Sequence, residues 1–289
     1  MGVTRSLIIK QRKKIVNKNR IIYLFVCQMF VFNVICFYFL KKVESCSFFL
    51  IKWTVLHEGR INLASLFLFY MKRDLKSFKT AIVSAVYFFI TYLFIRYGDS
   101  VGRIFDNSDG IAILKVMYAV FAFVGFLFGA SLFSNIISQG ISSRDFRFIL
   151  PYQSRRALYF SKFLMSFVFF LLQILISTIV VLVFRKDAVF SFQQFCNISI
   201  FYFYMLSIIT LISTISKNDR TAMLVNIIIS IIYPTIFVFS NFVNHDFLEL
   251  LLWITPYHYI EKTWEVLFLM LLSVVFLGIG VSVFEKKEI

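Results

Sequence analysis

Side chains that could do covalent or hydrolytic chemistry are sparse and scattered in this sequence. It contains no GxxxxGK[ST] phosphate-binding loop, no HExxH zinc motif and no GxSxG nucleophile motif. His245 and His258 lack the paired spacing of metal ligands, and no cysteine lies in a CxxC pair. The long apolar segments also lack the paired carboxylates of a proton relay. The sequence therefore predicts that the chain is not an enzyme, holds no metal and binds no cofactor itself.

A loop of mixed basic and apolar character, residues 138–161, is the first candidate functional element. It reads SQGISSRDFRFILPYQSRRALYFS. Ser142 or Ser143 can cap a short helix with Asp145 in its first turn, and Pro151 then disfavours further helix. The alternative is an ordinary interfacial loop whose arginines extend to the membrane surface. The functional interpretation is a docking element for a cytoplasmic partner, formed by Ser143, Arg144, Asp145, Phe146, Arg147, Phe148, Ile149 and Leu150.

The second candidate element connects the last two apolar blocks and reads NFVNHDFLELLLWITPYHYIEKTWEV. It is too apolar for a free loop, and it is too short and broken for a span because Pro256 interrupts it. We expect a pair of short re-entrant helices on the outer side, with Leu252, Trp253, Pro256 and Tyr257 as its site residues. The other interpretation is an aromatic belt at the membrane interface, formed by Trp253, Tyr257, Tyr259 and Trp264. The two interpretations are compatible.

Long apolar segments must position these two elements. The chain has 289 residues and is 60% hydrophobic, whereas soluble domains are about 45–50% apolar. Crossing a hydrocarbon core takes about 20 apolar residues, and backbone groups in lipid must be bonded within the segment, which favours helices. The sequence predicts an all-α integral membrane protein with apolar blocks at residues 21–40, 80–95, 111–137, 158–184, 192–215, 222–239 and 266–284.

The charges of the loops predict the orientation of the spans. Basic residues dominate segments 71–79, 138–162 and 217–220, and the C-terminal segment 285–289 contains Lys286 and Lys287, whereas segments 97–110 and 241–249 are acidic. These signs alternate across six spans and place the C-terminus in the cytoplasm; Arg185 and Lys186 are a local exception. The net charge of +15 fits short loops beside an anionic leaflet of the plasma membrane. Because these basic residues lie between apolar blocks, we expect no nucleic-acid partner.

The N-terminal region, residues 1–70, is harder to place. Residues 5–20 carry basic and no acidic side chains, so both they and residues 71–79 belong in the cytoplasm, which requires an even number of crossings between them. A returning helix over residues 47–70 would carry several charges near its middle, each costing about 2.5–3.5 kcal/mol. We therefore expect residues 21–40 to form a hairpin or partly re-entrant anchor, and residues 47–70 to contain amphipathic surface helices.

Four features of residues 71–289 occur in an informative order. A basic amphipathic segment, MKRDLKSFKT, precedes the first core span, and SSRDFRFILPYQSRRALYFSK separates the second from the third. Thr255 and Pro256 lie in the broken segment before the last span, and a short charged tail closes the chain. In this order they resemble a permease subunit of the ABC transporter type 2 export class. Residues 1–70 exceed the N-terminal region usual in that family.

The resemblance implies a six-span exporter permease core, residues 71–289, with an extra N-terminal hydrophobic segment, residues 1–70. It implies a homo- or heterodimer of permeases that pairs with separate cytoplasmic ATP-binding cassette subunits, which hold the ATP and Mg. The loop around residues 138–152 would act as the coupling helix, and residues 247–259 would shape the outer gate. The cargo would be amphipathic: a lipid, a lipid-linked glycan, a peptide or a drug.

Three other classes of protein stay open. A non-catalytic membrane scaffold, sensor or immunity protein would have no ATPase partner. A membrane-embedded enzyme would need convergent His, Asp, Glu or Cys side chains in its spans. A channel or secondary transporter usually needs polar or charged coupling sites at the midplane, whereas the amides in these spans, Asn135, Gln173, Asn197 and Asn226, fit helix–helix hydrogen bonds.

Overall fold

The computed structural model describes residues 63–75, 77–104, 110–143, 146–151, 153–185, 188–242, 252, 255–259 and 264–287. The expected anchor over residues 21–40, and the segment that precedes residue 63, lie outside the described residues. The helices in chain order are α2 (Leu63–Leu75), α3 (Phe78–Ile104), α4 (Gly110–Phe133), α5 (Ser138–Ser142), α6 (Phe146–Ile149), α7 (Arg155–Phe184), α8 (Phe192–Ile215), α9 (Asp219–Phe242), the 3-10 turn η1 (Pro256–Tyr259) and α11 (Val266–Lys286).

The prediction of six spans over residues 80–284 is confirmed. Within the described chain, six helices are long and apolar enough to cross a membrane: α3, α4 with its continuation into α5, α7, α8, α9 and α11. Several of them extend beyond their predicted ends, α3 and α7 among them. α3 continues through Arg96, which stays exposed while its guanidinium donates to the hydroxyl of Tyr92 one turn earlier at 3.0 Å. α7 begins at Arg155, because the Ser154 hydroxyl caps it by accepting from the Ala157 N–H at 3.3 Å.

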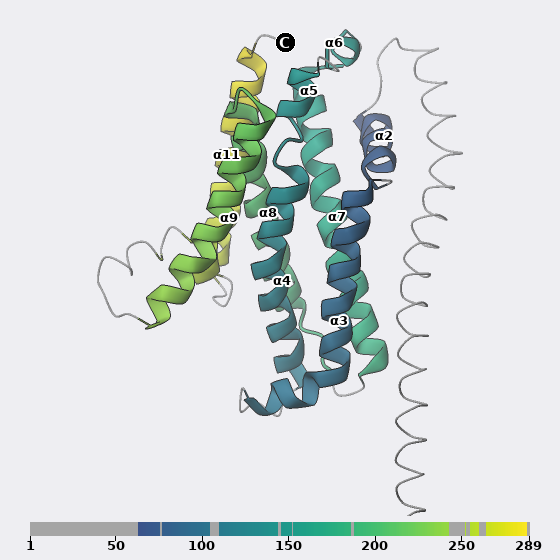
Figure 1. The fold of residues 1–289 in the computed structure, drawn as a ribbon, viewed down its shortest axis with the longest axis vertical. Coiled ribbons are helices and arrows are strands. Elements are labelled where there is room, and N and C mark those ends of the chain that lie inside the picture. The colour runs from purple at the N-terminus through teal and green to yellow at the C-terminus, as the bar shows by residue number, and fades with distance from the viewer. Residues whose placement is uncertain are drawn as a thin grey trace, which may run out of the picture.

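The spans run alternately up and down in one bundle (Figure 1). α2, α5, α6 and the last described residues lie together at the upper end in that view, which we call the α5–α6 end. α2 continues through the expected boundary between residues 70 and 71 and packs against α7. α8 contacts α4, α7, α9 and α11, and is the most enclosed of the spans. α9 leans away from the other spans at its far end (Figure 1).

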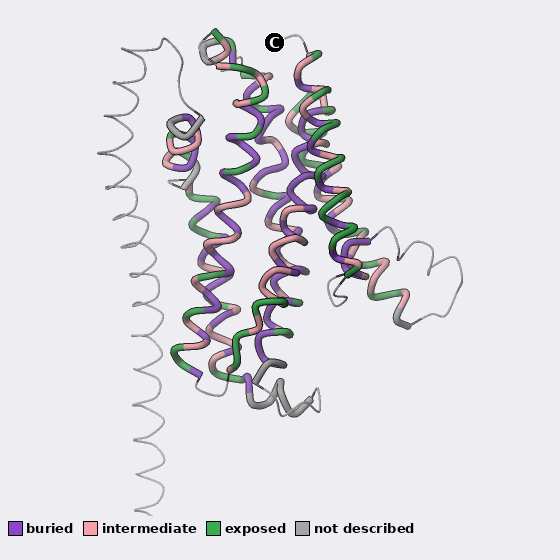
Figure 2. Tube along the Cα trace, turned by 180° about the vertical axis from the view of Figure 1, so that it is seen from behind, coloured by how far each residue is buried: buried purple, intermediate pink, exposed green. Residues whose placement is uncertain are grey.

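Exposed residues recur along the spans on the outside of the bundle (Figure 2), and many of them are large and apolar. α9 and α11 contribute many large exposed side chains, among them Leu224, Ile231, Leu271 and Val274. A water-soluble protein rarely exposes apolar surface over two whole helices. These faces therefore suit contact with lipid chains or with another membrane helix.

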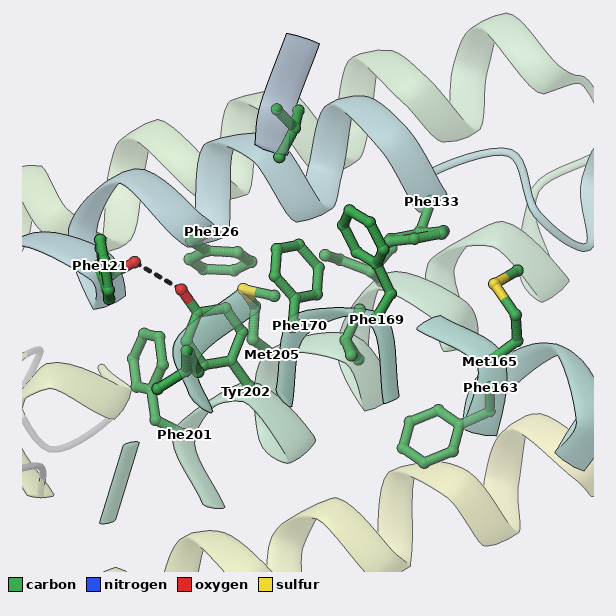
Figure 3. Packing of buried hydrophobic residues seen from close by; sticks show 14 of the residues in the cluster. Phe121, Phe126, Phe133, Phe163, Met165, Phe169, Phe170, Phe201, Tyr202 and Met205 are labelled. Carbon is green, nitrogen blue, oxygen red and sulfur yellow. Dashed lines mark hydrogen bonds between the residues drawn. The ribbon is translucent and has the colours of Figure 1, made fainter. Parts of the chain in front are cut away.

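The centre of the bundle is an aromatic cluster contributed by α3, α4, α7 and α8 (Figure 3). Tyr202 of α8 donates its hydroxyl to the backbone oxygen of Phe121 at 2.7 Å, and its ring stacks on Phe170 at 4.9 Å between centroids. The hydroxyl of Tyr87 is hydrogen-bonded to that of Tyr202. Lipid is as apolar as these rings, so close packing and internal hydrogen bonds, rather than exclusion of water, hold the helices together.

Arg185, an exception to the predicted alternation of loop charges, lies at the far end of the bundle. Arg185 is buried where α7 ends, and its guanidinium donates to the backbone oxygen of Phe94 at 3.4 Å. The same group lies against Gly98 of α3, where a Cβ would come 1.9 Å from Nη1. The guanidinium of Arg185 thus rests on the last turns of α3, which explains how a cation is tolerated at this end.

Gly125 of α4 leaves room for two tyrosine hydroxyls of the aromatic cluster. A Cβ on Gly125 would lie 1.9 Å from the Tyr202 hydroxyl and 2.6 Å from the Tyr87 hydroxyl. Both tyrosines are buried and hydrogen-bonded, so neither can move aside without breaking a contact. Gly278 of α11 has open space around it, with no atom within 4 Å of an added Cβ.

We expect Gly125→Ala to lower stability by about 1–3 kcal/mol, the usual cost of overpacking a tight core. Gly278→Ala is the matched control, and it should leave stability unchanged or raise it, because alanine favours helix by up to about 1 kcal/mol. The measurement is the apparent unfolding midpoint of the purified protein in detergent. Equal midpoints for the two variants would contradict the tight contact.

Candidate functional site

The first candidate element starts where the helical hydrogen bonding of α4 is interrupted. Beyond Phe133 the chain makes a turn before α5, and the N–H groups of Ile137 and Ser138 leave the helical pattern. Both donate instead to the hydroxyl oxygen of Ser213 on α8, each at 3.2 Å. Helical bonding resumes at Gln139, whose N–H donates to the Asn135 oxygen at 2.9 Å. One α8 side chain therefore fixes the bend from which residues 138–151, the docking segment, project.

Contacts with α9 secure the end of α5. We expected Ser142 or Ser143 to cap the start of a short helix, but both hydroxyls donate backwards to the Gln139 oxygen, at 3.1 and 2.7 Å. α5 ends at Ser142, and residues 144 and 145, which lead from these serines to α6, lie outside the described residues, so capping of that short helix stays a prediction. Ser142 also lies 3.0 Å from the nearer carboxylate oxygen of Asp219, the first residue of α9.

Phe146 is the apolar anchor of the docking segment. Its ring is buried and meets Phe284 of α11 edge-on, with 5.8 Å between centroids. It also covers Gly140 of α5, where a Cβ would stand 2.2 Å from the Phe146 Cζ atom. Leu150, half-buried, packs against the core. Phe146 therefore fastens the docking segment to α5 and α11.

The polar side of the docking segment is only partly described. Arg147 is exposed on α6, as an amphipathic element requires. Arg144 and Asp145 lie outside the described residues, and so do the side chains of Phe148 and Ile149. Docking by any of these residues stays a prediction.

Basic side chains tie three helix ends together beside the docking segment. Arg155 of α7 donates to the backbone oxygens of Glu285 and Lys287 at 2.5 and 2.7 Å, at the end of α11. Lys287 in turn donates its ammonium to the oxygens of Thr214 and Ser216, where α8 ends. A cation at a helix C-terminus satisfies open carbonyls and the helix dipole. Burial nevertheless lowers the pKa of the Lys287 amine.

The second candidate element enters the bundle from the opposite side. Thr255, Pro256 and Tyr257 are buried, and the Tyr257 hydroxyl donates to the Ala122 oxygen of α4 at 3.3 Å. At 1.5 Å per residue, Ala122 lies about 18 Å along α4 from its start at Gly110. The Tyr257 side chain thus reaches well inside the bundle, while most of the connection between α9 and α11 lies outside the described residues, so the expected pair of re-entrant helices stays a prediction.

The aromatic residues of this connection divide between two environments. Tyr257 packs on Phe201 of α8 and Phe237 of α9, at 5.2 and 5.6 Å between centroids. Tyr259 is also buried, so these two tyrosines do not form an interfacial belt, whereas Trp264 is exposed as a belt residue would be. Leu252 is half-buried, and Trp253 lies outside the described residues.

The structure does not bring the two candidate elements together. About 11 residues of α4, or roughly 16 Å, separate the Tyr257 contact at Ala122 from the end of α4 at Phe133. Any influence of one element on the other must pass along the spans. Among the described residues, no group of His, Cys, Asp and Glu side chains could hold a metal ion.

Sequence reasoning did not identify the residues that hold the docking segment in place. Ser213, Gly140 and Lys287 make decisive contacts, yet each is an unremarkable residue type in its own stretch of sequence. Their partners are distant in the chain, so no local spacing could reveal them. The one local signal was the position of Lys287 just after an apolar block, which suits a cation near a helix end.

No protein-family model matches the sequence, and no curated protein matches it significantly. The class of protein therefore follows from the fold alone. The chain is an all-helical, multi-pass membrane protein, since six of its described helices are long and apolar enough to cross a membrane.

Ser213→Ala should destabilise the bend between α4 and α5. The substitution leaves two buried N–H donors without their acceptor, and such a loss costs about 1–3 kcal/mol. Ser199→Ala on the same helix is the control, because its hydroxyl donates only to the Phe195 oxygen one turn earlier. Thermal unfolding in detergent should show a lower midpoint for the Ser213 variant alone. A midpoint equal to that of the control would rule out the bridging role.

Proposed function

We propose that this chain is the membrane-spanning subunit of an ATP-driven exporter that works with a separate ATP-binding subunit. The observation that carries the proposal is the attachment of the docking segment to the spans. It continues from α4 and leads into α7, and it contacts α8 through Ser213, α9 through Asp219 and α11 through Phe284. A partner that pushes on this segment would act on five spans at once.

The packing of these contacts suits mechanical transmission. Phe146 sits between α5 and α11 with no room for a Cβ on Gly140. Tightly packed groups cannot deform gradually, so a displacement is passed on as a movement of whole helices. A nucleotide-driven movement of the partner would therefore reach the spans as a rigid-body shift.

The re-entrant connection supplies a candidate for the opposite gate. Tyr257 bridges α4, α8 and α9 through its hydroxyl and its ring. A shift between these spans changes the place of η1, so access from that side would follow the movement at the docking segment. This role of Leu252, Trp253, Pro256 and Tyr257 is part of the proposal.

The proposal also assigns the nucleotide to the partner subunit and the cargo to the spans of this chain. ATP and Mg belong to the partner, because this sequence has no phosphate-binding loop. The aromatic spans suit an amphipathic cargo such as a peptide, a lipid or a drug. The exposed apolar faces of the spans leave room for a second permease, identical or related.

The proposal requires the α5–α6 end to face the cytoplasm of the plasma membrane. We expect single cysteines at Ser143 and Asn218, both exposed at that end, to resist a membrane-impermeant maleimide applied to intact cells. A cysteine at Val189, exposed in the turn between α7 and α8, should react readily. The experiment uses a variant without the native cysteines, and permeabilised cells should label all three positions. Reaction of Ser143→Cys in intact cells would reverse the orientation.

Reversal of charge on the docking segment tests the partner directly. We expect Arg147→Glu to weaken co-purification of an ATP-binding subunit at least tenfold, about 1.4 kcal/mol, because Arg147 is exposed on α6. Adding Arg144→Glu should deepen the loss. Quantitative mass spectrometry of the affinity-purified complex, in mild detergent, measures the ratio of the two subunits.

The control is Arg96→Glu, which reverses an exposed arginine near the other end of the bundle. It should leave the ATP-binding subunit bound, while both variants insert normally in the membrane. Equal subunit ratios for the Arg147 and Arg96 variants would remove the docking role. A wild-type preparation with no ATP-binding subunit would favour a membrane scaffold, sensor or immunity protein instead.

A further inference from the structure

A cavity of about 380 Å³ opens at the α5–α6 end, between α2, the start of α3, the end of α4 with α5, and α7. Sites for small ligands commonly have volumes of about 300–1,000 Å³. The cavity borders the docking segment through Gly140 and Phe146, but the rest of its wall has a different character. It is lined by cations and neutral hydrogen-bonding groups, which nothing in the proposed docking role explains.

A buried cation lies in the wall of this cavity. Lys162, in the second turn of α7, is only 2% exposed, although a buried ammonium carries a desolvation penalty of several kcal/mol. Its Nζ atom stands 3.6 Å from the ring centroid of Tyr70 on α2, in cation–π contact. The Tyr70 ring therefore holds Lys162 at the cavity and joins α2 to α7.

Two more cations stand at the mouth of the cavity. Arg73 lies one turn beyond Tyr70 on α2, with Cζ 5.3 Å from the same ring, and Lys79 lies in the first turn of α3. Both are exposed and both line the cavity. Three positive charges thus converge from three helices on one space.

Neutral polar groups and the apolar side chains of Leu132, Phe133 and Ile136 complete the wall. Asn135 and Gln139, linked by a 3.4 Å hydrogen bond between their amides, face the cations from the α4–α5 side. Ser77 adds a hydroxyl before the start of α3, whereas the Thr80 hydroxyl donates to the Ser77 oxygen at 2.6 Å. Among the described residues that line the cavity none is a carboxylate. Guanidinium, ammonium, amide and hydroxyl groups together are the donors that bind phosphate oxygens.

We propose that this cavity binds the phosphate of an anionic phospholipid, with Lys162 in its wall and Arg73 and Lys79 at its mouth. Phosphate is the chemistry that the donors select, and a soluble phosphate would share it. The lipid source is favoured by Phe69 and Phe78, two exposed apolar residues of α2 and α3 that adjoin the lining residues Tyr70 and Lys79 in the sequence and offer acyl chains a surface. The site is independent of any ATP-binding partner.

The test measures thermal stabilisation of the purified full-length chain in detergent, because a ligand that binds the folded state raises its midpoint with concentration. Phosphatidylglycerol is the probe, diacylglycerol lacks the phosphate, and sodium phosphate lacks the chains. We expect saturable stabilisation by phosphatidylglycerol and none by diacylglycerol. If sodium phosphate stabilises the chain equally well, the phosphate site stands and the lipid source is overturned.

Variants connect the effect to the cavity. Arg73→Gln with Lys79→Gln should weaken the apparent affinity for phosphatidylglycerol at least tenfold. Lys217→Gln with Arg220→Gln is the control, because it removes the same charge from exposed residues at the same end but outside the cavity. The control should keep wild-type affinity. Equal loss in both double variants would show general charge attraction and overturn the proposal, as would wild-type affinity in the cavity variant.

The Lys162→Met variant tests separately whether the buried cation contributes to the affinity for phosphatidylglycerol. Methionine retains an unbranched apolar side chain and removes the charge, so we expect at least a tenfold loss of affinity with the exposed cations intact. If this variant does not fold, the double variant at the mouth still decides the matter. A folded Lys162→Met chain with wild-type affinity would exclude Lys162 from the site.

Discussion

Inside a membrane, a backbone N–H that leaves its helical partner finds no water, so the protein itself must supply an acceptor. The chain departs from continuous helix within the bundle at the α4–α5 bend, and Ser213 accepts from both N–H groups that are released there. Where α8 and α11 end, Lys287 and Arg155 serve the open carbonyls in the same way. These side chains make irregular backbone tolerable, and they also determine which spans lie side by side.

The same constraint explains how much of the fold could be predicted from the sequence. Six apolar blocks predicted six spans because length and apolarity alone decide whether a helix can cross. The apolar block ended at residue 95, but α3 continues to Ile104, with Arg96 exposed and hydrogen-bonded to Tyr92 one turn earlier. Local composition predicts which segment of a helix lies in lipid, but the residue at which the helix ends depends on individual contacts.

Prediction of the candidate site was less complete. Pro151 predicted that the helix would break, and α6 ends at Ile149, two residues before it. The serines at 142 and 143 were expected at the start of a short helix, and the composition of the segment did not reveal that their hydroxyls also bond back to Gln139 of α5. The contacts with Ser213, Asp219 and Phe284 join residues that are far apart in the sequence, so they require the fold itself.

Gly140 and Phe146 illustrate a dependence that reaches beyond this one chain. The ring of Phe146 fills the space that any larger residue at position 140 would need, so each residue sets the size permitted at the other. A small residue at position 146 would relax the demand for glycine, and a bulky residue at 140 would require the ring to be lost. In an alignment of relatives these two positions should therefore covary, with their combined volume held nearly constant.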